Sequence, residues 1–130
     1  MPTPQTRNCD LFAVVSVREY AGAVAWYERL LGEPPAFIAH PTEAVWEFDD
    51  HRYLAVEEEP EHAGHTQLTV FLPDLDAFVD AAAARGVAPA RRETYENGVR
   101  KVTYTDPDGS EIGFGGAPVD GAAAEASADP

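Results

Sequence analysis

Residue types that most often perform chemistry are sparse in this sequence, whereas aromatic residues that can bind ligands are common. Cys9 is the only cysteine, which excludes an intrachain disulfide and a cysteine-rich metal site. No Gly-x-Ser-x-Gly motif occurs, and His40, His51 and His62 lie beside turn-prone residues rather than in a catalytic constellation. Aromatic side chains on predicted strands can instead stack on a planar ligand and attract a cation. They are Phe12, Phe37, Trp46, Tyr53 and Tyr104.

The charge of the chain limits its partners. Nine Lys plus Arg stand against 23 Asp plus Glu, which gives a formal net charge of -14. Such a field repels nucleic acid and concentrates cations near the surface. We therefore predict no nucleic-acid partner. Attraction of a positively charged small molecule and simple solubility are both consistent with the charge.

Length and composition predict one compact domain. The 130 residues are 45% hydrophobic and 10% aromatic, which is enough to form a core without disulfides. A single cysteine fits a reducing compartment. The sequence shows neither a secretory signal nor the roughly 18 consecutive apolar residues of a membrane span. We therefore predict a cytoplasmic protein with no membrane partner.

The elements that must position the aromatic side chains repeat twice along the chain. The first set begins with a β-branched apolar run that predicts a strand. A helical face follows, with bulky residues at spacings of four, three and four, and then three short strands. These elements are predicted at 11–17, 20–31, 37–40, 44–49 and 53–58. After a charged linker at 57–64, the second set has strands at 67–72, 90–95, 99–105 and 110–114, with a helix from Leu75 toward Gly86.

This repeat predicts an α+β fold of two βαβββ modules, at 11–58 and 67–114, within a single domain. Gly32 and Gly86, which end the two helices, are 54 residues apart. Two copies cannot form a solenoid, so the modules should pair around a shared space. Residues 1–10 are predicted to be a loose N-terminus. The segment 115–130 consists of small residues, acids and prolines and is predicted to be a disordered tail.

Several short motifs occur in a fixed order along the two modules. They are Val17-Arg18-Glu19, Ala25-Trp26-Tyr27, Leu30-Leu31-Gly32, Pro73-Asp74-Leu75-Asp76-Ala77, Arg85-Gly86-Val87 and Asp106-Pro107-Asp108-Gly109. Taken together they resemble the vicinal oxygen chelate superfamily, which includes glyoxalase I, extradiol dioxygenases, fosfomycin resistance proteins and bleomycin-binding proteins. The resemblance implies that the modules form an incomplete barrel around a cavity, which is usually completed in a homodimer.

The resemblance also implies where a catalytic metal would bind. Enzymes of this superfamily hold a divalent metal with four cavity-facing residues, commonly His or Glu, on the first and last strands of each module. The corresponding positions here are Phe12, Ala55, Gln67 and Gly113. None is a His or a carboxylate, and the amide oxygen is a weak ligand for a transition metal, so we predict no metal and no other cofactor. A register shifted by two residues keeps the same strand face and would instead offer Glu57, His65 and Glu111.

A cavity without a metal favours binding over catalysis. By resemblance to the bleomycin-resistance branch, we predict a protein that sequesters an aromatic, cationic drug and so confers antibiotic resistance. The predicted ligand-binding residues are Phe12, Phe37, Trp46, Tyr53, Glu57, Gln67, Tyr104 and Glu111. Glu57 and Glu111 would select the cation, and Gln67 would orient the ligand. The alternatives are a metal-dependent lyase, isomerase or dioxygenase using His65, Gln67 and Glu111, and an interaction module with an empty cavity.

Overall fold

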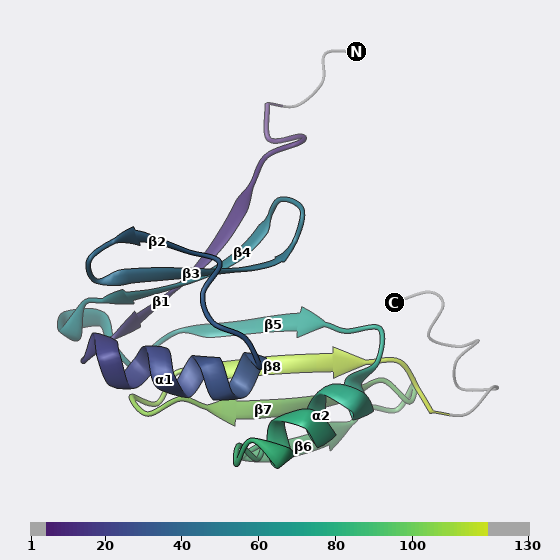
Figure 1. Ribbon diagram of the computed structural model, residues 1–130. Coiled ribbons are helices and arrows are strands. Elements are labelled where there is room, and N and C mark those ends of the chain that lie inside the picture. Colours follow the sequence, from purple (N-terminus) through teal and green to yellow (C-terminus); the bar gives the residue numbers. More distant parts are fainter. Residues whose placement is uncertain (1–4, 120–130) are drawn as a thin grey trace.

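The computed structural model describes residues 5–119, which form two sheets and two helices (Figure 1). The first module contains β1 (Leu11–Val17), α1 (Tyr20–Leu31), β2 (Phe37–His40), β3 (Glu43–Asp49) and β4 (Arg52–Glu58). The second contains β5 (Gln67–Phe71), α2 (Leu75–Ala84), β6 (Arg91–Thr94), β7 (Arg100–Thr105) and β8 (Glu111–Gly116), and a 3-10 turn (Pro60–His62) lies between the modules. The predicted α+β fold of two βαβββ modules is confirmed.

Small differences from the prediction occur at the ends of elements. Strand β8 continues to Gly116, so Gly115 and Gly116 belong to the second sheet rather than to a loose tail. Glycine is needed there because a β-carbon at Gly116 would lie 2.5 Å from the β-carbon of Leu75 on α2. The rest of the predicted tail from residue 120, and residues 1–4 of the predicted loose N-terminus, lie outside the described residues.

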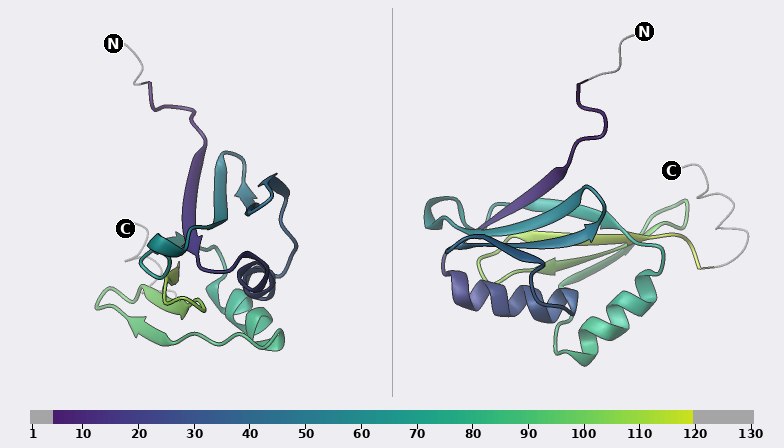
Figure 2. Two further views of the ribbon diagram at one scale, coloured as in Figure 1. Left: turned by 90° about the vertical axis from the view of Figure 1, so that its left-hand side faces the viewer. Right: turned by 45° about the horizontal axis from the view of Figure 1, so that its top comes forward.

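The two sheets share one topology. The first sheet has the strand order β1-β4-β3-β2 and the second the order β5-β8-β7-β6. In each, the first and last strands of the module pair in parallel and the remaining neighbours are antiparallel. Within residues 5–119 each sheet stays open, as expected for halves of an incomplete barrel (Figure 2).

One side of both sheets is covered by the helices, and the other side is uncovered. The covered side holds a single core to which both modules contribute, including Val15, Leu54 and Ile112, each 0% exposed. Side chains alternate along a strand, so the residues between the core positions point to the opposite side. There Phe12 and Val14 are each 44% exposed. Apolar side chains at this exposure, two residues apart on one face of β1, belong to the kind of surface that proteins use for binding.

The helices begin and end where local chemistry requires. The Glu19 side chain caps α1 by accepting hydrogen bonds from the backbone N–H groups of Ala21 and Gly22, both at 2.9 Å. At its other end Gly32 adopts φ 84°, a left-handed conformation that favours glycine. Neither this helix nor any other in residues 5–119 is long and apolar enough to cross a membrane.

The Asp-Pro-Asp-Gly turn of the second module is anchored on the first. Asp106, only 3% exposed, accepts a hydrogen bond of 2.8 Å from the Tyr27 hydroxyl on α1. It also accepts from the backbone N–H groups of Asp108 and Ser110, at 3.0 and 2.9 Å. Burial, followed by the nearby Asp106, raises the pKa of Tyr27, so its hydroxyl remains a donor. Asp108 in turn accepts from the backbone N–H of Arg18 at 3.0 Å.

The segment that precedes β5 also packs on this turn. Thr66 donates its backbone N–H to the Ser110 hydroxyl at 3.1 Å and accepts from the Glu111 N–H at 2.8 Å. Gly64 has φ 89°, and a β-carbon there would overlap the backbone carbonyl oxygen of Asp108. The turn therefore contacts both the first module and this segment.

Candidate ligand-binding site

Three of the predicted aromatic residues come together on the uncovered face of the first sheet. Phe12 on β1 pairs with Tyr53 on β4, and their rings stack with centroids 4.5 Å apart and planes 13° apart. Phe37 on β2 meets Tyr53 edge-on, with centroids 6.4 Å apart. Glu47 lies beside this group because it is the cross-strand partner of Tyr53 on β3. The arrangement is an aromatic surface with the exposed carboxylate of Glu47 next to it.

The corresponding place on the second sheet is polar. Gln67 and Glu111 pair across the parallel strands β5 and β8, just as Phe12 and Tyr53 do in the first module. The Gln67 amide donates to Glu111 at 3.2 Å, and the Arg91 guanidinium donates to both of its oxygens at 3.4 Å. Hydrogen bonding to Arg91, followed by its charge, lowers the pKa of Glu111. The carboxylate predicted to select a cation is thus already paired with one.

A cavity of about 330 Å³ opens beside this pair on the second sheet. Gly113 forms part of its floor, and a β-carbon there would lie 2.7 Å from the Lys101 Cε and 3.1 Å from the Thr69 Oγ1. The Lys101 side chain therefore extends across the space that a side chain at 113 would fill. The lining is completed by residues from all four strands, namely Gln67, Leu68, Thr69, Arg91, Lys101, Thr103, Glu111 and Gly113.

Glu57 lies on the first sheet and has partners of its own. The His40 Nε2 lies 3.0 Å from the Glu57 carboxylate and 3.3 Å from that of Glu43. Among residues 5–119 these three form the one group of His, Cys, Asp or Glu whose atoms converge closely enough to share a metal ion. Glu57 is therefore not grouped with His65 and Glu111, the set that a shifted register would offer. Those two line a shallow depression at the start of the second sheet.

Trp46 and Tyr104 are placed on the core side of their strands and not on the face that carries Phe12. Trp46 is 1% exposed and donates its indole N–H to the Glu33 carbonyl at 2.9 Å. Tyr104 is 0% exposed and packs edge-on against Phe78 and Phe114. The sequence had left open which face of the strand these two predicted ligand-binding residues occupy. Their parity directs them under the helices, so neither joins Phe12 on the uncovered face, and Trp46 instead borders the larger cavity between the modules.

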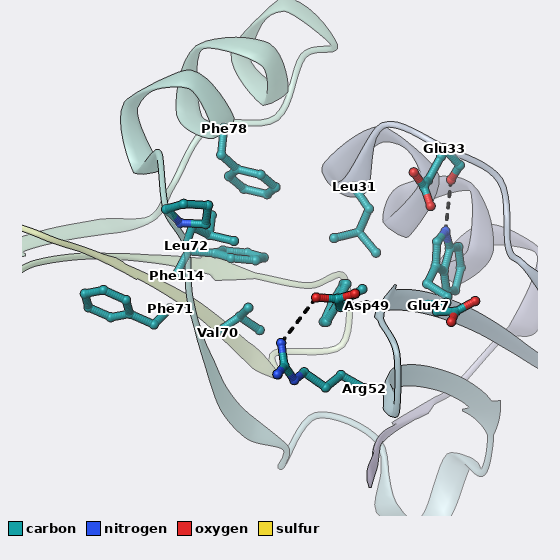
Figure 3. Close-up of a pocket in the computed structure, with 13 residues that line it drawn as sticks. Leu31, Glu33, Glu47, Asp49, Arg52, Val70, Phe71, Leu72, Phe78 and Phe114 are labelled. Atoms are coloured by element: carbon teal, nitrogen blue, oxygen red, sulfur yellow. Dashed lines mark hydrogen bonds and ion pairs between the residues drawn. The ribbon is translucent and has the colours of Figure 1, made fainter. Parts of the chain in front are cut away.

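A second, larger cavity of about 450 Å³ lies between the two modules (Figure 3). Its apolar wall includes Leu31 from the first module and Phe78 and Phe114 from the second, while Asp49 and Arg52 form an ion pair of 3.5 Å at one side. Because its lining comes from segments far apart in the chain, no local sequence pattern indicates it.

A family model matches residues 11–114, and its description is the Glyoxalase/Bleomycin resistance protein/Dioxygenase superfamily. The chain belongs to this superfamily. The match spans both modules of the fold, so the resemblance seen in the motifs is confirmed.

Solved structures of other superfamily members share the fold. A glyoxalase/bleomycin resistance protein from Catenulispora acidiphila is 55% identical, with a TM-score of 0.82, and the match covers 85% of this chain and 99% of that one. A bleomycin-binding protein complexed with bleomycin is 20% identical (TM-score 0.67, covering 82% and 97%). A lactoylglutathione lyase from Agrobacterium tumefaciens is 15% identical (TM-score 0.66, covering 86% and 96%). No curated protein sequence matches the chain.

The positions at which the superfamily resemblance places metal ligands do not fit a metal in this chain. Phe12, Ala55 and Gly113 have no donor atom in their side chains. The amide of Gln67 is held by its hydrogen bond to Glu111, and that carboxylate is held by Arg91. The residues present therefore form an aromatic half-site and a polar half-site instead of a metal centre.

Several site residues were not predicted from the sequence. His40, Arg91, Lys101 and Thr103 become visible only when strands are paired, since Arg91 lies opposite Thr103 between β6 and β7. For His40 a local signal existed. Its spacing of three from Glu43 across the turn-prone Pro41 and Thr42 indicates a hairpin that brings the two side chains together.

Proposed function

We propose that this superfamily member is a small-molecule binding protein that holds an aromatic ligand without a metal and confers drug resistance by sequestration. The observation that carries the proposal is the exposed stack of Phe12 on Tyr53, at a position where a metal ligand would otherwise stand. Exposed aromatic faces bury a large area against a planar ligand, and each well-placed aromatic pair adds about 0.5–1.5 kcal/mol beyond that area. Sequestration requires only tight binding, so no catalytic group is needed.

The charge of the site supports a cationic group on that ligand, although the selecting residue differs from the predicted ones. Glu57 contacts His40 and Glu111 contacts Arg91, so both predicted carboxylates have partners within the chain. Glu47 is exposed and lies directly across from Tyr53. We assign to Glu47 the role of attracting a cation toward the aromatic surface, with the net charge of -14 assisting at longer range.

Replacing Phe12 with alanine should weaken binding of an aromatic ligand about tenfold, because it removes one ring of the stack and the area that ring would bury. Thermal-shift and fluorescence titrations with bleomycin and a panel of planar aromatic compounds measure this. The matched control is Ile38→Ala, which removes a 54% exposed apolar side chain from β2. Its partner on β3 is Ala44, whereas Phe37 pairs with Val45, so Ile38 faces away from the aromatic group.

Two results would contradict this proposal. One is an unchanged affinity in the Phe12→Ala protein for a compound that the native protein binds. The other is the finding that protein purified without chelator contains a stoichiometric divalent metal, and that this metal is lost when Gln67 is replaced. The second result would favour the metal-dependent lyase, isomerase or dioxygenase instead.

We further propose that the uncovered face is shared between two copies of the chain. Phe12 and Val14 on β1 and Phe37 on β2 are each 44–45% exposed on one face of the first sheet, which is unusual for a surface that remains in water. Light scattering at micromolar concentration should therefore give twice the monomer mass. Val14→Arg should give the monomer mass, because it places a charge on the apolar surface that the second copy would cover. A monomeric native protein would refute the dimer.

A further inference from the structure

The cavity on the second sheet contains a cation without a partner. Lys101 is the only lysine of the chain, and its side chain lies along the cavity over Gly113. No hydrogen bond or ion pair joins its ammonium group to another residue in the range 5–119, whereas Arg91 next to it contacts both Glu93 and Glu111. An ammonium group offers three donors and no acceptor. The cavity therefore presents unused donors toward its open space.

A buried hydroxyl in the same cavity is also without a partner. Thr103 is 2% exposed, lines the cavity, and its Oγ1 has no hydrogen-bond partner among the described residues. It lies opposite Gly113 on β8, which in turn lies opposite Thr69 on β5. A buried polar group left without a hydrogen bond costs about 1–3 kcal/mol, so this hydroxyl indicates a group supplied from outside the chain.

The remaining polar side chains do not compete for that outside group. Glu111 also lines the cavity, but its oxygens accept from Gln67 and from both terminal nitrogens of Arg91. The hydrogen-bond donors that remain available in the cavity are the ammonium of Lys101, the hydroxyl of Thr103 and the unused N–H groups of Arg91. Donors and positive charge around a small cavity are the chemistry that recognises an oxyanion.

We propose that this cavity binds an oxyanion, a carboxylate or phosphate group of a small molecule, with Lys101 as the ion-pair partner and Thr103 as a hydrogen-bond donor. This rests on the small-molecule binding proposed above and adds the class of group that the second half-site takes. Phe71 is 58% exposed in the adjacent row of the sheet, across Gly115 from Lys101. An apolar body attached to the oxyanion would pack on that ring, which makes an aromatic carboxylate a suitable probe.

Calorimetric titration of the full chain with benzoate, benzamide and inorganic phosphate tests the proposal. Benzoate should bind at least tenfold more tightly than benzamide, its neutral counterpart of similar shape. Lys101→Met should lower the benzoate affinity at least tenfold and Thr103→Val about threefold, while Lys101→Arg should retain most of it. The matched control Arg92→Gln removes an exposed cation on the other face of β6, since Arg92 pairs with the buried Val102, and should leave the affinity unchanged. Inorganic phosphate probes the same donors without a ring, and its affinity should also fall in the Lys101→Met protein.

The outcomes separate this proposal from the preceding one. Equal binding of benzoate and benzamide, or unchanged benzoate affinity in a folded Lys101→Met protein, would overturn the oxyanion site. The oxyanion site would also be overturned if the protein bound neither benzoate nor phosphate. If that protein still bound an aromatic compound through Phe12, the proposed aromatic site would be unaffected. Lys101-dependent benzoate binding without any Phe12-dependent ligand would uphold the oxyanion site and refute the aromatic one.

Discussion

Replacing Asp106 with alanine should lower the free energy of unfolding by about 3–5 kcal/mol, because it leaves a buried phenol and two backbone N–H groups without their acceptor. Asp106 is 3% exposed, and the Tyr27 hydroxyl that donates to it belongs to a side chain that is 0% exposed. Water cannot replace the lost acceptor at such a site without a rearrangement of the turn. Urea unfolding followed by tryptophan fluorescence measures the change.

The variant Tyr27→Phe is the matched comparison for this prediction. It removes one donor and leaves Asp106 with the N–H groups of Asp108 and Ser110, so the expected loss is about 1–2 kcal/mol. Equal losses for the two variants would mean that the turn's own hydrogen bonds contribute nothing. A loss below 1 kcal/mol for Asp106→Ala would show that the turn does not anchor the first module.

Gly64→Ala should destabilise the protein by about 3 kcal/mol or more, whereas Gly86→Ala should cost only about 1–2 kcal/mol. The two glycines have nearly the same backbone conformation, with φ of 89° and 87°. Their surroundings differ. A β-carbon at Gly64 overlaps the Asp108 carbonyl oxygen, while one at Gly86 meets no atom within 4 Å. The difference between the two losses therefore isolates the clash from the cost of the left-handed conformation.

Thermal unfolding measures both glycine variants under one condition. For a domain of this size each kcal/mol corresponds to about 4–8 °C in Tm. Similar shifts for the two proteins would show that the segment before β5 can move away from the turn at little cost. That result would also remove the argument that this segment holds the turn in place.

Most of the fold was predictable because short-range sequence patterns indicate each element of the repeat. The spacing of bulky residues from Tyr20 to Leu31 gives the helix α1 with its observed bounds, and the apolar run from Leu11 gives β1. Glycine residues indicate where the two helices end, and the Asp-Pro-Asp-Gly motif indicates the turn between the last two strands. Phe12 and Tyr53 were each predicted as ligand-binding residues from the sequence, whereas the stacking of their rings was not predicted.

The parts of the site that were not predictable depend on which face a strand buries and on its neighbours. In β3 three consecutive residues, Ala44, Val45 and Trp46, are all buried, so alternation could not tell which face of the strand lies under the helices. The pairing of Glu111 with Arg91 requires the second sheet to bring β6, β7 and β8 together in one register. No sequence spacing indicates that contact. The pairing with Arg91 matters because it neutralises the Glu111 carboxylate that was predicted to attract a cation.

The hydrogen bond between Tyr27 and Asp106 joins residues 79 positions apart. During synthesis the ribosome produces α1 long before the turn that receives its phenol, so until the last strands emerge that hydroxyl has only water as a partner. A nascent chain stopped after β4 would therefore hold an incomplete core, exposed to proteases and chaperones. The first module can therefore complete its packing only after the turn at Asp106, in the last quarter of the chain, has been synthesised.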